Sequence, residues 1–159
     1  MSPVRANVWL TTGFVAVTGA AAWGFTPWQR SLVTVVDLAL FGLGIAAFAW
    51  AFGLAVVRSR TQDISVGGLF LLSGGIVSRR DAMVMHGCLA VQSLTGVAGA
   101  MVRASTDGRP GSVLAFGVLV PMLGVGLNGV VAMSRGSFGS RRTSEDDDEP
   151  PIGKNGAHG

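Results

Sequence analysis

Few side chains in this chain could do chemistry inside its long apolar runs. Asp37 is the single acidic residue within such a run, and His86, Cys88 and Gln92 share another. Asn128 lies in a third. A carboxylate in an apolar membrane segment usually faces a bundle interior or a water path, where it can bind a proton or a cation. The two amides suit hydrogen bonds between neighbouring helices.

Asp37 has two interpretations that the sequence leaves open. In the first, it is the proton- or cation-coupling residue of a transporter. In the second, it is structural, because it lies five residues after Leu32, about 8 Å into the run at 1.5 Å per residue. There it would pair with Arg30 or Arg103, or cap a helix that begins at Leu38. A carboxylate at the membrane boundary is less unfavourable than a central one, which favours the structural interpretation.

No recognisable catalytic or cofactor motif accompanies these residues. Cys88 is the only cysteine, so the chain has no intrachain disulfide and no CxxC pair. His86 alone cannot supply both axial ligands of a bis-histidine haem. The sequence lacks a phosphate-loop motif, a nucleophile elbow, an HExxH motif and a GxGxxG that follows a strand and opens a helix. We therefore expect no enzyme activity, no cofactor and no metal.

Four apolar runs dominate the chain and indicate an all-α integral membrane protein. Hydrophobic residues make up 49% of it and charged residues 13%, whereas soluble domains carry about 25% charge. The predicted helices are 8–25, 32–57, 82–102 and 113–133, which form a four-transmembrane-helix bundle in a membrane domain of residues 1–133. About 20 apolar residues cross the hydrocarbon layer, so the last three qualify clearly.

The first run, of 18 residues, is marginal. It follows Arg5 and ends in small residues, so residues 1–22 could instead be a cleaved signal peptide. Trp9 and Trp23 bracket the run as interfacial anchors do. Their placement favours a retained helix.

Basic residues set the predicted orientation. With a cytoplasmic N-terminus and four crossings, nine basic residues are cytoplasmic and three are external. The cytoplasmic set is Arg5, Arg58, Arg60, Arg79, Arg80, Arg135, Arg141, Arg142 and Lys154, and the external set is Arg30, Arg103 and Arg109. This positive-inside bias places both termini in the cytoplasm. Arginines at the ends of apolar runs also argue against a nucleic-acid surface.

The stretch ISVGGLFLLSGGIV, residues 64–77, is apolar but only 14 residues long. It lies between two cytoplasmic arginine pairs, and its glycines interrupt any continuous helix. We predict a short cytoplasmic interfacial or re-entrant element that packs on protein. Residues 134–159 are glycine-rich and charged, which predicts a disordered cytoplasmic tail.

Small residues in the predicted helices indicate close backbone packing. They let helix backbones approach closely in a membrane, where hydrophobic burial does not drive helices together. Pro121 is expected to kink the fourth helix. The predicted helix-packing residues are Gly42, Gly96, Gly99, Gly117, Gly124, Gly129, Gln92 and Asn128.

Two stretches, LAFGVLVPMLGVGLNGVVAMSRGSFGSR (114–141) and VRSRTQDISVGGLFLLSGGIVSRR (57–80), carry a resemblance. Together they resemble a family of small uncharacterised multi-pass membrane proteins of GC-rich bacteria, over roughly residues 30–142. Eleven arginines against one lysine agree with such a source. The resemblance implies a bacterial inner-membrane location and brings no site residues.

The sequence thus favours a non-enzymatic membrane protein that is an accessory or scaffold subunit of a larger complex. Its expected partners are the lipid bilayer and other membrane subunits or copies of itself, with no nucleic acid. The alternative is a small oligomeric transporter that uses Asp37 for proton or cation coupling.

Overall fold

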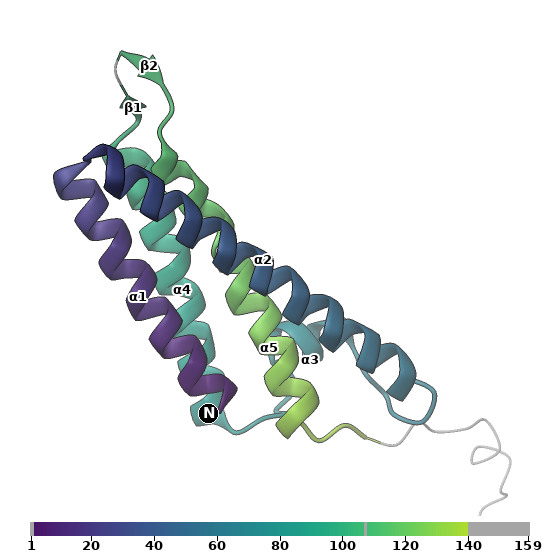
Figure 1. Ribbon diagram of the computed structural model, residues 1–159. Helices are drawn as coiled ribbons and strands as arrows, with labels where there is room; N and C mark the ends of the chain where they lie inside the picture. The colour runs from purple at the N-terminus through teal and green to yellow at the C-terminus, as the bar shows by residue number, and fades with distance from the viewer. Residues whose placement is uncertain (1, 107, 140–159) are drawn as a thin grey trace, which may run out of the picture.

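The chain forms long helices that alternate in direction (Figure 1). The computed structural model describes residues 2–106 and 108–139. Its helices are α1 (Pro3–Gly24), α2 (Pro27–Arg58), α3 (Val66–Leu71), α4 (Arg79–Val102) and α5 (Pro121–Arg135), with a 3-10 helix η1 (Val113–Leu119) directly before α5. Two short strands, β1 (Ser105–Thr106) and β2 (Arg109–Pro110), form an antiparallel hairpin between α4 and η1.

Capping residues determine where three of the long helices begin. The Ser2 side chain caps α1, and Pro3 follows it at the first helical position, where a proline costs no hydrogen bond. Thr26 and Gln29 form a capping box at the start of α2, and Ser78 caps α4. Because these caps lie outside the apolar runs, the helices start three to five residues before the predicted bounds.

Three segments are long and apolar enough to cross a membrane: Pro27–Arg58, Arg79–Val102 and Val113–Arg135. The third is divided at its proline, because η1 ends at Leu119 and the α-helix begins at Pro121. Pro121, where a kink was expected, is the first residue of the α-helical part. α1 has 22 residues and is not among the three, since its inward face carries polar side chains. The structure therefore shows a helical protein with three candidate spans.

The described arginines separate between the two ends of the molecule. The starts of α1 and α4 lie at the same end as the finishes of α2 and α5, opposite the β1–β2 hairpin (Figure 1). That end carries six arginines: Arg5, Arg58, Arg60, Arg79, Arg80 and Arg135. The hairpin end carries Arg30, Arg103 and Arg109. We call these the arginine-rich end and the hairpin end.

Two arginines at the hairpin end hold the turn between α1 and α2. The guanidinium carbons of Arg30 and Arg103 lie 4.3 and 4.9 Å from the centre of the Phe25 ring. Arg103 also donates to the carbonyl of Ala22 at 3.0 Å, and Arg30 donates to the carbonyl of Phe25 at 3.2 Å. These contacts satisfy carbonyl groups at the end of α1, which would otherwise be unpaired.

The apolar element 64–77 forms the short helix α3 and does not span. α2 diverges from α1 towards the arginine-rich end, and α3 lies there beside α5 (Figure 1). Leu69, Phe70 and Leu72 are buried, and the Phe70 ring stacks on Phe48 of α2 with 4.3 Å between ring centres. The element thus packs on protein, against α5 and against the Phe48 ring of α2.

The predicted tail begins later than residue 134. α5 continues to Arg135, the Ser137 amide donates to the carbonyl of Ile76, and the Gly139 carbonyl accepts from the Asp63 amide. Residues 136–139 are therefore paired with the segment around α3. The rest of the predicted tail, residues 140–159, lies outside the described residues.

Candidate functional site

A hydrogen-bonded polar cluster joins α1 to α4 inside the bundle. The Gln92 amide nitrogen donates to Asn7 Oδ1 at 3.0 Å and to Thr11 Oγ1 at 2.7 Å. Asn7 in turn donates to the sulfur of Met85 at 3.4 Å. Gln92 and Asn7 are fully buried, and Thr11 is nearly so. Gln92 therefore forms hydrogen bonds between α4 and α1.

Asp37 is fully buried on the inward face of α2. Neither of its carboxylate oxygens has a hydrogen-bond partner among the described residues. Both parts of the structural interpretation are therefore wrong: Arg30 and Arg103 bond to backbone carbonyls near Phe25 instead, and α2 is capped by Thr26.

The depth of Asp37 also differs from the expectation. α2 begins at Pro27, ten residues earlier, so Asp37 lies about 15 Å along the helix at 1.5 Å per residue. An ionised carboxylate at that depth would need a partner that none of the described residues supplies. Chemically, the position suits a group that exchanges a proton or a cation.

Five of the six predicted packing glycines lie against another element. An added Cβ at Gly96 would collide with the Gly117 carbonyl, and one at Gly117 would meet Gly96 Cα at 3.3 Å. At Gly124 it would lie 2.8 Å from Gln92 Oε1, and at Gly129 it would lie 2.8 Å from the side chain of Ala51. Gly99 faces Thr18 in the same manner.

Gly42 is the exception, because nothing lies within 4 Å of an added Cβ there. Within this chain, therefore, no described residue packs against Gly42. Gly44, two residues further on, makes the contact instead: its added Cβ would lie 2.5 Å from the Leu123 amide nitrogen. Gly126 packs on the Gly44 carbonyl. Two residues turn a helix by about 200°, so Gly42 and Gly44 face opposite sides.

Asn128 and His86 hold the α3 element rather than another long helix. Asn128 donates to the Phe70 carbonyl at 2.9 Å, and His86 Nε2 lies 2.8 Å from the Leu71 carbonyl oxygen. Asn128 was predicted to join spanning helices, so its actual partner differs. The carbonyls of Phe70 and Leu71 lie at the end of α3. The last carbonyls of a helix have no partner within the helix, so the side chains of Asn128 and His86 supply one.

The sequence analysis missed three buried polar residues of α1: Asn7, Thr11 and Thr18. Their spacing of four and then seven residues repeats along one face of a helix. That spacing could have identified them as one polar face of a helix, but the predicted run began at Val8 and excluded Asn7.

Metal chemistry has no evident site in the part of the chain that the structure describes, where no three His, Cys, Asp or Glu side chains group together. Comparison with known proteins adds no assignment: no family model, curated protein or solved structure matches the chain. The candidates are therefore defined by geometry alone: the buried polar cluster around Gln92 and, separately, the buried carboxyl group of Asp37.

Substituting Gly44 and Gly42 by alanine tests the backbone contact. Gly44→Ala should lower the free energy of unfolding by about 1–3 kcal/mol, because the added methyl group displaces backbone atoms. Gly42→Ala is the matched control and should be neutral or raise stability by up to about 1 kcal/mol through helix propensity. Unfolding in mixed detergent micelles, followed by circular dichroism, measures both. Equal effects of the two changes would contradict the packing described.

Proposed function

We propose that this protein is a non-enzymatic integral membrane protein of a bacterial inner membrane and an accessory or scaffold subunit of a larger complex. In this proposal four helices cross the membrane, α1 among them, and both termini are cytoplasmic. The arginine-rich end is cytoplasmic and the hairpin end is external, in keeping with the positive-inside rule.

The orientation of α1 supports a fourth span. Its polar residues Asn7, Thr11 and Thr18 face the bundle interior, whereas Trp9 and Trp23 are 68% and 92% exposed. Asn7 and Thr11 accept hydrogen bonds from Gln92, and a helix with apolar side chains outside and polar ones inside fits a membrane bundle. Since α1 forms the Gln92 cluster with α4, we propose that it is retained rather than cleaved.

Tryptophans on α2 give a matching estimate of membrane thickness. Trp28 and Trp50 are exposed and lie 22 residues apart on one helix, about 33 Å at 1.5 Å per residue. The hydrocarbon core is about 30 Å thick, and tryptophan is enriched at both of its surfaces. Asp37 then lies near the middle of the span.

The observation that carries the scaffold proposal is the outward face of α2. Its small residues recur every three to four positions, remain exposed, and leave a smooth strip beside the buried face. We call this the α2 outer face; its small residues are Ala39, Gly42, Ala46, Ala49 and Gly53. Its counterpart, the inner face with Gly44, already packs on α5. The proposed occupant is a transmembrane helix of another subunit.

Co-purification tests this proposal. The full chain is extracted from its native membrane in mild detergent, and the accompanying proteins are quantified by mass spectrometry. We expect the unmodified chain to co-purify with a membrane subunit in stoichiometric amount. With Gly42→Leu, the recovery of that subunit should fall by about tenfold or more. That loss reflects a bulky side chain that prevents close helix approach.

Gly87→Leu is the matched control. Gly87 is also an exposed helical glycine with nothing within 4 Å of an added Cβ, but it lies on α4. The control should keep the partner. Recovery of the chain only with itself, as a defined homo-oligomer, would contradict the accessory role and favour the alternative below.

A second candidate function is favoured by Asp37. Both of its oxygens are buried without a partner among the described residues, and such intramembrane carboxylates commonly mark proton or ion pathways. The alternative is therefore a small oligomeric transporter in which Asp37 binds a proton or a cation. It requires the chain to form its own oligomer.

Proteoliposomes distinguish the two functions. With a pH-sensitive dye inside and an imposed potassium diffusion potential, a proton-coupled transporter should take up protons faster than empty vesicles. Asp37→Asn should abolish that uptake, because an amide cannot exchange the proton. The scaffold proposal predicts no uptake above empty vesicles and normal co-purification of Asp37→Asn. Asp37-dependent uptake would therefore contradict a purely structural role.

A further inference from the structure

A basic cavity lies between α1 and α4 at the arginine-rich end. It has a volume of about 420 Å³ and is lined by Ser2, Val4, Arg5, Arg80, Asp81, Val84 and Arg135. Arg135 is paired with Asp81 at 3.0 Å, so one of the three arginines is neutralised. The cavity therefore keeps a net positive charge, and the amino end of α1 at Ser2 adds the positive end of a helix dipole.

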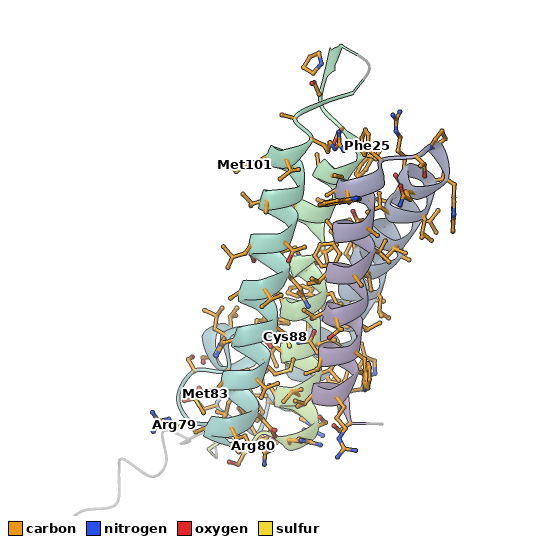
Figure 2. All side chains as sticks on the ribbon, turned by 90° about the vertical axis from the view of Figure 1, so that its left-hand side faces the viewer. Phe25, Arg79, Arg80, Met83, Cys88 and Met101 are labelled. Atoms are coloured by element: carbon orange, nitrogen blue, oxygen red, sulfur yellow. The ribbon has the colours of Figure 1, made fainter. Side chains whose placement is uncertain are left out.

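An apolar groove continues from this cavity along the same two helices. Its volume is about 520 Å³, and Val8, Thr11, Thr12, Val15, Ala16, Val84, Gly87, Cys88 and Val91 line it. Val84 belongs to both spaces, and Val8 lies one turn after Val4 on α1. Figure 2 views this side of the molecule, with Arg80 at the start of α4 and Cys88 further along it, beside α1.

The two spaces together have the shape and polarity of one amphipathic ligand. We propose that they bind an anionic phospholipid, with its phosphate among Arg5, Arg80 and Arg135 and an acyl chain in the groove between α1 and α4. The inference rests on the proposed membrane placement, in which the cavity lies at the cytoplasmic surface and the groove in the hydrocarbon. Basic cavities between membrane helices on that side suit anionic head groups.

Charge and position favour this occupant over a protein segment. The groove runs about 10 Å from Val8 to Val15 at 1.5 Å per residue and faces outward, where lipid is the surrounding solvent. Arginine forms charge-assisted, often bidentate hydrogen bonds with phosphate. A helix of another subunit would fill the groove but would leave Arg5 and Arg80 of the cavity without an anion.

Native mass spectrometry of the full chain in detergent tests the proposal. The protein is titrated with phosphatidylglycerol and, separately, with phosphatidylcholine that carries the same acyl chains. We expect a preference of at least about fivefold for phosphatidylglycerol, and a loss of about fivefold in its affinity with Arg80→Gln, since each basic residue at the surface adds about that factor.

Arg79→Gln is the control for general attraction. Arg79 precedes Arg80 on the same turn but does not line the cavity, and Figure 2 shows it further from α1. Its substitution should change the affinity by less than about twofold. Equal losses for the two variants would overturn a defined site in favour of diffuse surface charge.

Gly87→Leu tests the acyl groove. Because nothing lies within 4 Å of an added Cβ at Gly87, the leucine can occupy the groove without disturbing the fold, which circular dichroism checks. The substitution should lower the affinity of the protein for both lipids. If millimolar inorganic phosphate displaces the lipid and Gly87→Leu has no effect, the cavity is a soluble-anion site and the proposal is wrong.

These readouts separate this inference from the scaffold role. Lipid binding is measured on the isolated chain, whereas the scaffold role is measured by co-purification. The Gly42→Leu chain should no longer co-purify with the partner subunit but should bind lipid normally. The Gly87→Leu chain should co-purify with the partner subunit but bind lipid more weakly. Loss of lipid specificity with intact co-purification would overturn the lipid site alone.

Discussion

Direct contact between helix backbones is the constraint on which the rest of this bundle depends. The segment from η1 into α5 lies between α2 and α4, with Gly44 facing Leu123 and Gly126 on one side and Gly96 facing Gly117 on the other. Between helices in a bilayer, hydrophobic burial gives little drive, so van der Waals contact and hydrogen bonds must hold them. Glycine at these crossings permits both, because no side chain separates the backbones.

The polar interior follows from that closeness. Gln92 lies beside Gly124 and reaches Asn7 and Thr11 across the α1–α4 interface. The surfaces for which we propose partners therefore lie outside, on the α2 outer face and along the α1–α4 groove. Asp37 and Thr18 are exceptions, since neither the carboxylate oxygens of Asp37 nor the Thr18 hydroxyl has a hydrogen-bond partner among the described residues.

The sequence predicted the elements that are determined by residues close together in the chain. Apolar runs of about 20 residues predicted the three helical segments that are long and apolar enough to span, and the internal glycines of 64–77 predicted that it forms no long helix. Helix starts were placed too late, although the Ser2-Pro3 and Thr26-Pro27 pairs mark them. Those caps lie outside the apolar runs on which the boundaries were based.

The sequence could not predict which face of each helix packs against which neighbour. Gly42 and Gly44 look equivalent in a list of small residues, yet only Gly44 packs within the chain. Likewise, Asn128 has the chemistry to join long helices, but its partner is the Phe70 carbonyl, whose position depends on how the 64–77 segment folds back. Rotation and long-range placement are set by the whole bundle.

The central proposal is that α1 is a fourth span and that the arginine-rich end is cytoplasmic. Single cysteines at Ser2, Ser73 and Gly108, in a Cys88→Ala background, test it by labelling of spheroplasts with a membrane-impermeant maleimide. The account predicts that Gly108→Cys reacts in sealed spheroplasts, whereas Ser2→Cys and Ser73→Cys react only after lysis. Labelling of Ser2→Cys in sealed spheroplasts, with Ser73→Cys protected, would contradict it.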